Sequence, residues 1–224
     1  MTAADADVSR LPIVILISGR GSNMRVIAEL AAKGELPVAV RAVISDRADA
    51  AGLAVAAAMG IPALTLSPRS YSDRASYDTA LASLVGKYQP GLVALAGFMR
   101  ILTANFIGPF ADRILNIHPS LLPKYRGLHT HQRALQAGDA VHGVSVHFVT
   151  EELDGGPAII QACIDVHSDD TEASLSARVQ RQEHRIYPQA VEWFARGRLE
   201  LRKDRVWLDG KQLDAPVMID ARGS

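Results

Sequence analysis

The chain has little of several features that mark particular classes of protein. Cys163 is its only cysteine, so no internal disulfide can form, and this usage fits a reducing compartment such as the cytoplasm. No apolar run approaches the roughly 20 residues that a membrane-spanning helix needs, and the first ten residues lack the apolar core of a signal peptide. Lysine plus arginine equals aspartate plus glutamate at 24 each, so no overall positive charge favours nucleic-acid binding.

The rest of the composition is that of an ordinary globular protein. Of the 224 residues, 48% are hydrophobic and 21% are charged, which is enough for one domain with a substantial core. No internal repeat and no long linker divides the chain. We therefore expect a flexible extension over residues 1–10, a single domain over residues 11–210 and a C-terminal tail over residues 211–224.

Strand-like and helix-like segments alternate through the first half of the chain. Short apolar runs predict strands at residues 11–17, 38–45, 62–66, 92–96 and 113–118. Helical patterns lie between them at residues 23–33, 50–59, 72–88 and 103–108, with Ser22 as the expected cap of the first helix. This alternation predicts an α/β fold with an open, mainly parallel, twisted sheet, helices on both faces and a Rossmann-like N-terminal half.

The pattern changes in the second half. We expect a short helix at residues 131–137 and two strands at residues 143–150 and 157–164. A long helix follows over residues 171–196, which Pro188 is expected to kink or divide. Residues 199–201 and 205–208 predict a terminal hairpin around Lys203 and Asp204.

Asn116 and His118 stand two residues apart at the end of an apolar run. Residues two apart in a strand point to the same face, and open α/β sheets bind ligands at the carboxyl ends of their strands. An amide can donate to a developing oxyanion, a histidine can move a proton near neutral pH, and an aspartate such as Asp154 can orient that histidine. Together they suit acyl transfer. Taken alone, Asn-x-His is more often a hydrogen-bonded polar pair, and Asp-Gly-Gly-Pro from Asp154 is ordinary turn chemistry.

The segment Gly19-Arg20-Gly21-Ser22-Asn23 joins the first predicted strand to the first predicted helix. Glycines let the backbone approach a phosphate, and free amides at a helix start favour an anion. Met24 stands where a dinucleotide-binding motif would have its third glycine, which disfavours a nicotinamide dehydrogenase. By itself the segment fits a plain strand-to-helix turn about as well.

Several motifs in one order resemble the formyltetrahydrofolate-dependent formyltransferases. Asn116, His118 and Asp154 match the Asn-His-Asp set of that family. The other matching stretches are residues 17–23, 95–102, 120–131, 145–149 and 178–184, and the resemblance runs from about Leu11 to about Gly210. It implies the formyltransferase fold. It also implies transfer of the formyl group of 10-formyltetrahydrofolate to the amine of glycinamide ribonucleotide in purine (IMP) biosynthesis.

The same resemblance implies roles for individual residues. Asn116, His118 and Asp154 would be catalytic. The ribonucleotide's phosphate is expected at Gly21, Ser22 and Asn23, and its ribose and glycinamide portions at Gln180 and Glu183. The folate is expected at Arg74, Arg100, Ile101, Leu102, Val149, Thr150, Glu151, Glu152 and Leu153, with His147, Ser145 and His129 behind the reacting groups. Without the resemblance, Glu183 and Arg74 would be interpreted as solvated surface charges.

The expected partners are these two small-molecule substrates, with no metal, no redox cofactor, no nucleic acid and no membrane, in a monomer or homodimer. Two rival functions stay open. A formyltetrahydrofolate deformylase shares the Asn-His-Asp set and passes the formyl group to water, whereas a non-catalytic phosphate- or folate-binding module would form no product. Arg126 replaces the proline frequent in the purine branch and resembles the tRNA formyltransferases, whose additional C-terminal domain is not expected here.

Overall fold

The computed structural model describes residues 10–223, so the predicted extension, apart from Arg10, and Ser224 lie outside the described residues. The strands are β1 (Leu11–Ile17), β2 (Val38–Ser45), β3 (Ala63–Thr65), β4 (Leu92–Leu95), β5 (Ile114–His118), β6 (Val141–Phe148), β7 (Ala158–Asp165), β8 (Leu199–Arg202), β9 (Arg205–Leu208), β10 (Lys211–Gln212) and β11 (Val217–Asp220). The helices are α1 (Ser22–Ala32), α2 (Ala51–Ala58), α3 (Arg74–Gly86), α4 (Ala104–Ile107), α5 (Thr130–Ala137) and α6 (Glu172–Ala195), with short 3-10 helices at Pro68–Ser70 and Gly108–Phe110.

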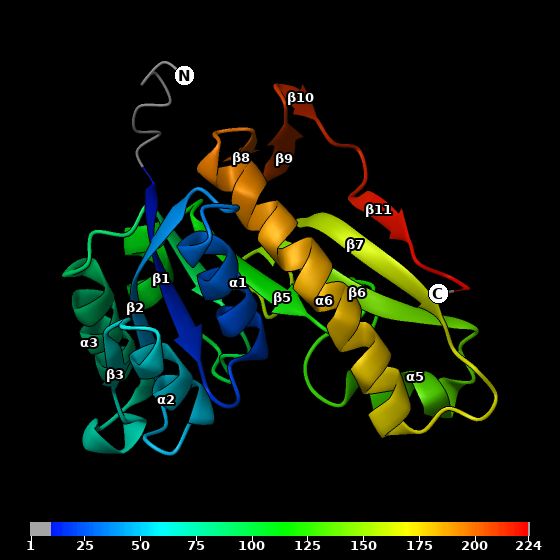
Figure 1. Cartoon of the computed structure of the whole chain (residues 1–224), viewed down its shortest axis with the longest axis horizontal. Helices are drawn as coiled ribbons and strands as arrows, with labels where there is room; N and C mark the ends of the chain where they lie inside the picture. Colours follow the sequence, from blue (N-terminus) through cyan, green and yellow to red (C-terminus); the bar gives the residue numbers. More distant parts are fainter. Residues whose placement is uncertain (1–9, 224) are drawn as a thin grey trace.

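One large sheet lies at the centre, with helices against both of its faces (Figure 1). Its eight strands have the order β11-β7-β6-β5-β4-β1-β2-β3. Strand β6 is antiparallel to β5 and β7, and the other pairs are parallel. The predicted mainly parallel α/β sheet is therefore confirmed.

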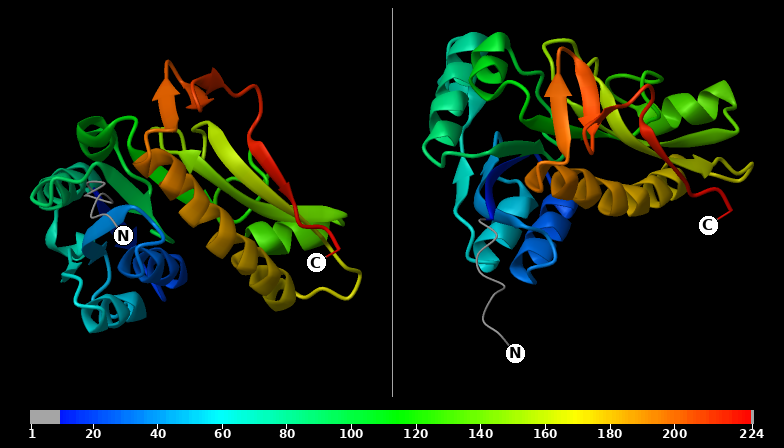
Figure 2. Two further views of the ribbon diagram at one scale, coloured as in Figure 1. Left: turned by 45° about the horizontal axis from the view of Figure 1, so that its top comes forward. Right: turned by 90° about the horizontal axis from the view of Figure 1, so that it is seen from above.

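Strand β1 shows why the sheet needs continuous apolar runs. Ile13, Ile15 and Ile17 pack in one cluster with residues of α1 and α6, whereas Val14 and Leu16 pack in another with residues of α3 and α4. All five are fully buried, because successive strand residues face opposite sides and both sides are covered. Figure 2 shows α6 crossing the sheet beside α1. Within residues 10–223, no helix combines the length and apolar character required to cross a membrane.

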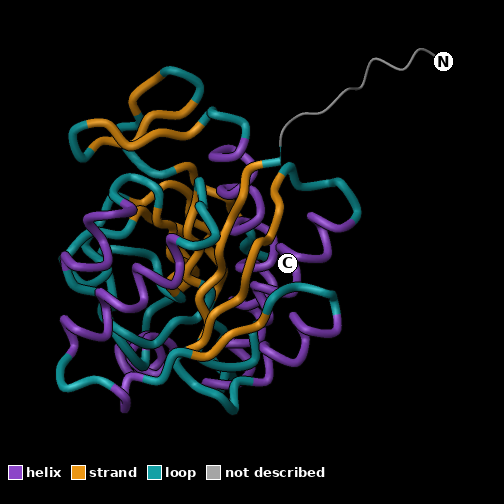
Figure 3. The backbone as a smooth tube through the Cα atoms, turned by 90° about the vertical axis from the view of Figure 1, so that its left-hand side faces the viewer, coloured by secondary structure: helices purple, strands orange, loops and turns teal. Residues whose placement is uncertain are grey.

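The C-terminal segment contains more strand than expected. The predicted hairpin forms as β8 and β9, and β10 adds to it in a small sheet at one end of the molecule (Figure 3). Strand β11 then returns to the large sheet and pairs in parallel with residues 160–163 of β7. The expectation of a tail over residues 211–224 missed both strands, because segments of two and four residues are too short to show a period.

The expected cap of the first helix was wrong, and the long helix is not divided at Pro188, which was one of the two outcomes expected there. Gly21, with a φ of 70°, is the N-cap of α1 and makes no side-chain cap; Ser22 is already helical, and its Oγ accepts a hydrogen bond from Gln180 Nε2 at 3.2 Å. Helix α6 runs uninterrupted past Pro188, so it is not divided. Pro188 and the adjacent Tyr187 are buried, and this packing offsets the backbone hydrogen bond that a proline removes.

The half-buried His131 of α5 meets the buried His142 of β6. The Nδ1 atom of His131 lies 3.1 Å from Nε2 of His142, and their rings meet edge to face. Burial, followed by the nearby His131, lowers the pKa of His142 to about 4. Burial also lowers the pKa of His131. Both rings are therefore neutral at neutral pH, and one nitrogen of the pair donates to the other.

Because both histidines are neutral in the folded protein, we expect the protein to become less stable toward unfolding as the pH falls. Between pH 6.5 and about 4 the unfolded chain protonates His142 while the folded chain keeps it neutral, so the free energy of unfolding falls as the pH falls, by up to about 1.4 kcal/mol per pH unit for this group. Denaturant unfolding of His142→Gln should show a shallower slope over this range. The matched control is His167→Gln, which changes an exposed histidine. An unchanged slope in His142→Gln would contradict the assignment.

Candidate functional site

The site lies where the chain order of the sheet reverses. From β1 the chain builds β2 and β3 to one side, then crosses back to place β4 and β5 on the other. Crevices at the carboxyl ends of strands flanking such a reversal are the usual binding sites of open α/β sheets. Here Ser18, after β1, donates from its N to Gly97 O at 3.0 Å, and its Oγ accepts from Met99 N at 2.8 Å. The loops that follow β1 and β4 are thereby joined.

A cavity of about 530 Å³ opens beside these loops, within the range of small-molecule sites. Asn116, His118, Asp154 and His147 all line it. Most of its other lining comes from three segments, namely residues 98–102, residues 127–131 and residues 149–153. The predicted folate residues Arg100, Ile101, Leu102, Val149, Thr150, Glu151, Glu152 and Leu153 are all among its lining, as is His129.

Asn116 is held by a histidine on the neighbouring strand. The register of β5 against β6 places Asn116 directly opposite His147, so their side chains share a face. His147 is 2% exposed, and burial lowers its pKa to about 4. Its Nδ1 lies 2.8 Å from the carbonyl oxygen of Phe148 and donates to it, which leaves Nε2 as an acceptor for Asn116 Nδ2 at 3.0 Å. The second N–H of the amide stays available to a ligand.

His118 has an oxygen acceptor at each ring nitrogen. Its Nε2 lies 2.9 Å from the carbonyl oxygen of Tyr125, and its Nδ1 lies 3.4 Å from Asp154 Oδ2. A doubly protonated imidazole can donate to both. The ring is therefore oriented from two sides, and its cationic form has a carboxylate beside it.

Asp154 reaches this position from the loop after β6. Its φ of 48° is in the left-handed region, and its Oδ2 accepts from Gly127 N at 2.8 Å. Its Oδ1 lies 3.7 Å from His147 Nε2. The side chain is 9% exposed, so the carboxylate acts on both histidines with little screening by water.

Ser145 lies behind the cavity rather than in its lining. It is fully buried and stands opposite His118 in the β5–β6 register. Its Oγ donates to Ser120 O at 2.6 Å and accepts from Leu122 N at 3.0 Å. These bonds hold the loop after β5, the same loop that brings the Tyr125 carbonyl to His118.

The residues expected at the phosphate and glycinamide form a second group. Gln180 and Glu183 project from α6 to the start of α1, where Glu183 Oε2 accepts from Asn23 Nδ2 at 2.7 Å and Gln180 contacts Ser22. Burial raises the pKa of Glu183, and the hydrogen bond from Asn23 opposes the rise. Asn23 Oδ1 is buried without a hydrogen-bond partner among the described residues. None of these four, nor Gly21, lines the cavity itself.

Gly21 has no room for a side chain. A Cβ there would lie 3.0 Å from the Cα of Gly52, and Gly52 N donates to Gly19 O at 3.0 Å. The loop thus passes closely over the start of α2, which leaves its outer side and the first amides of α1 open to an anion.

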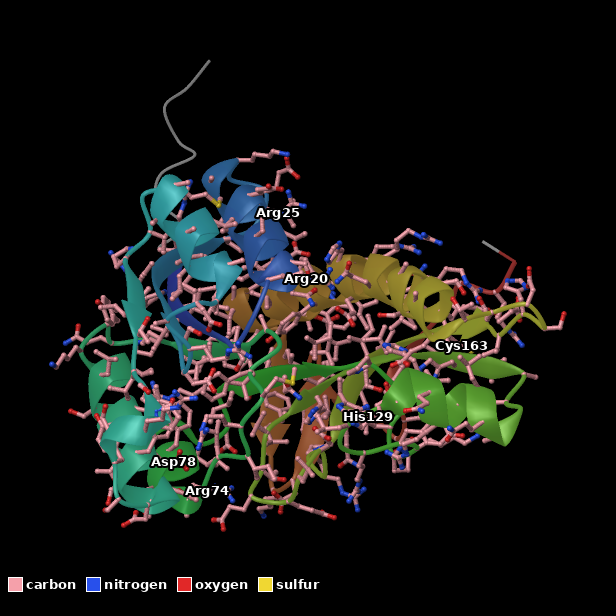
Figure 4. The ribbon with its side chains drawn as sticks, turned by 90° about the horizontal axis from the view of Figure 1, so that it is seen from below. Arg20, Arg25, Arg74, Asp78, His129 and Cys163 are labelled. Atoms are coloured by element: carbon pink, nitrogen blue, oxygen red, sulfur yellow. The ribbon has the colours of Figure 1, made fainter. Side chains whose placement is uncertain are left out.

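Arg74 is the one predicted folate residue that the structure does not bring to the cavity. Figure 4 shows it beside Asp78 on α3, apart from His129. Several cavity residues were not among the predicted site residues, and two of them, Met99 and Leu128, are 67% and 66% exposed. Large exposed apolar side chains mark binding surfaces, but their exposure depends on the fold. Among residues 10–223, no three His, Cys, Asp or Glu side chains are grouped so as to hold a metal ion.

Known proteins are similar to this chain in sequence and in fold. A family model described as formyl transferase matches residues 11–191. The phosphoribosylglycinamide formyltransferase of Escherichia coli (strain K12) is 52% identical over 201 residues, which are 90% of this chain and 95% of that protein. The trifunctional purine biosynthetic protein adenosine-3 of Homo sapiens is 39% identical over 189 residues, 84% of this chain and 19% of that longer protein.

Solved structures are also similar. The phosphoribosylglycinamide formyltransferase of Coxiella burnetii has a TM-score of 0.89 at 47% identity, covering 93% of this chain and 99% of that one. Glycinamide ribonucleotide transformylase 1 of Symbiobacterium toebii has a TM-score of 0.88 at 44% identity, covering 90% and 95%. By motif, sequence and fold together, the chain belongs to the formyl transferase family.

Proposed function

We propose that this chain transfers the formyl group of 10-formyltetrahydrofolate to the amine of glycinamide ribonucleotide, as the names of its relatives suggest. The observation that carries the proposal is the arrangement of Asn116, His118 and Asp154 around one cavity with apolar walls. The amide of Asn116 can donate a hydrogen bond to the oxyanion, and the imidazole of His118 can carry a proton. The carboxylate of Asp154 can stabilise that imidazole when it is positively charged.

The reaction needs one bond formed and one broken. The neutral amine of the ribonucleotide attacks the formyl carbon, and the carbonyl oxygen becomes an oxyanion. The intermediate then collapses, the bond between the formyl carbon and the folate nitrogen breaks, and that nitrogen takes a proton while the attacking nitrogen loses one. No electron acceptor is required, and the protein's task is electrostatic stabilisation and positioning.

Asn116 would donate to the oxyanion. One N–H of its amide is used by His147 Nε2, which fixes the plane of the amide and directs the other N–H away from that bond. His147 acts as an acceptor only while it is neutral, and its pKa of about 4, caused by burial, keeps it neutral at physiological pH.

His118 and Asp154 would handle the proton. As a cation, His118 adds positive charge beside the oxyanion, and Asp154 Oδ2 at 3.4 Å stabilises that cation. The carboxylate is oriented by the Gly127 amide, so little reorganisation is needed during the reaction. The cationic His118 can give a proton to the departing folate nitrogen, and the neutral ring so formed can take up the proton that the attacking amine loses.

The two substrates would enter from different sides. The exposed apolar residues Met99, Ile101, Leu128 and Leu153 at the cavity suit the flat ring of a folate. The backbone amides at the start of α1 suit a phosphate. Glu183, which accepts from Asn23 beside them, suits the amine-bearing portion of the ribonucleotide.

The activity is tested by following folate product spectrophotometrically, with and without glycinamide ribonucleotide. Product that forms only with the ribonucleotide supports the transferase. Equal rates without it identify a deformylase, and absence of product with retained folate binding identifies a binding module.

Asn116→Ala should lower kcat by about 100- to 1000-fold, because one oxyanion donor is lost. The fold should remain, since the residue is only half-buried. Asn105→Ala is the matched control, because Asn105 is exposed and lies outside the cavity lining.

Asp154→Asn should also slow turnover severely. Near-normal kcat in either purified cavity variant would remove that residue from the mechanism.

Glu183→Gln should raise the KM for the ribonucleotide by about tenfold or more. The reason is that the charge-assisted hydrogen bond between the Glu183 carboxylate and the amine-bearing portion of the ribonucleotide becomes a neutral one. The KM for the folate should stay the same. Glu192→Gln changes the same residue type at the other end of α6, where the carboxylate accepts from Arg196, and should alter neither constant. Equal increases in both constants for Glu183→Gln would argue against a specific contact with the ribonucleotide.

A further inference from the structure

The segment from Gly97 to Thr103, here called the wall loop, forms one side of the cavity. It contributes five consecutive lining residues, 98–102. Its outer residues are poorly packed, since Met99 is 67% and Ile101 46% exposed. The position of this wall therefore depends on the contacts that hold its inner side.

Helix α3 holds the far end of the wall loop through a buried carboxylate. Asp78 is fully buried, and its Oδ2 accepts a hydrogen bond from Thr103 N at 2.6 Å. Burial of a carboxylate is costly unless it is hydrogen-bonded, and Asp78 Oδ1 has no partner among the described residues. This costly arrangement joins α3 to the residue at which the loop ends and α4 begins.

The residue next to Asp78 supports the middle of the loop. The guanidinium carbon of Arg100 lies 4.9 Å from the centroid of the Tyr77 ring, a cation–π geometry. Tyr77 is 1% exposed and belongs to the same apolar cluster as Phe98 and Leu102. Its hydroxyl has no hydrogen-bond partner among the described residues, so the ring is the part that acts.

Neither residue lines the cavity, and Figure 4 shows Asp78 on α3, apart from the cavity residue His129. We propose that Asp78, together with Tyr77, is a positioning residue for the folate: it holds the wall loop at Thr103 and Arg100 and thereby fixes the surface against which the ring system binds. The inference rests on the proposed function in so far as the ligand of this cavity is a folate.

Steady-state kinetics with both substrates test the proposal. Asp78→Ala leaves the Thr103 N–H without its acceptor and should raise the KM for 10-formyltetrahydrofolate by about tenfold or more, with the KM for the ribonucleotide within about twofold of wild type. Asp78→Asn keeps an acceptor oxygen of the same reach and should restore most of the affinity.

The matched control is Asp73→Ala. Asp73 is the N-cap of the same helix, and its carboxylate also accepts a backbone hydrogen bond, from Ser76 N at 2.7 Å, but it has no hydrogen bond to the wall loop. A second pair keeps the test decisive if Asp78→Ala does not fold. Tyr77→Leu removes the ring under Arg100 and should raise the folate KM, whereas Tyr77→Phe keeps the ring and should behave as wild type.

Hydrogen exchange of residues 97–105 gives a readout that does not need activity. Faster exchange of the Thr103 amide in Asp78→Ala, but not in Asp73→Ala, is expected. Faster exchange with an unchanged folate KM would overturn the proposal, because the hydrogen bond would then be structural only. If the wild type forms no product, the proposed function fails, and fluorescence titration with 10-formyltetrahydrofolate decides whether Asp78→Ala weakens binding to this cavity.

Discussion

The antiparallel pairing of β5 with β6 is the constraint on which the site depends. Its register sets Asn116 opposite His147 and His118 opposite Ser145. Each functional side chain therefore has its supporting side chain on the adjacent strand, at the distance that direct cross-strand neighbours have. A shift of β6 by one residue would turn His147 and Ser145 to the other face of the sheet, away from Asn116 and His118. The buried, neutral state of His147 completes the arrangement, because only a neutral ring can accept from the Asn116 amide.

The parts of the fold that could be predicted are those in which one local signal decides the outcome. Strand β1 matches its predicted bounds because both faces are covered and its apolar run is continuous. Strand β2 also matches, although the exposed Arg41 interrupts its run. The Asn116–His118 spacing correctly indicated two side chains on one cavity, since strand geometry alone fixes that relation. Helix α6 shows the limit of such reasoning, because the packing around Pro188 overrides the local preference against proline.

The remaining contacts join residues that are distant in sequence. Asn23 meets Glu183 across 160 positions and Met99 meets Ser18 across 81, and no periodicity or spacing encodes either contact. The support of the wall loop by Asp78 is of the same kind, since an aspartate inside a helix is normally predicted to be exposed. The resemblance to known formyltransferases was the source of the residues predicted to bind the phosphate and the folate, but it gave no information about these supporting residues.

Strand β11 has a consequence for the behaviour of the protein in a crowded solution. Without it, β7 would present the unpaired amides and carbonyls of a long apolar strand at the edge of the sheet. With it, the outermost strand has only four residues, and it ends at the exposed Asp220, which is paired with Arg222. Short edges bearing charge resist the addition of a strand from another molecule. The last residues of the chain therefore protect the sheet from aggregation, although they lie outside the lining of the cavity.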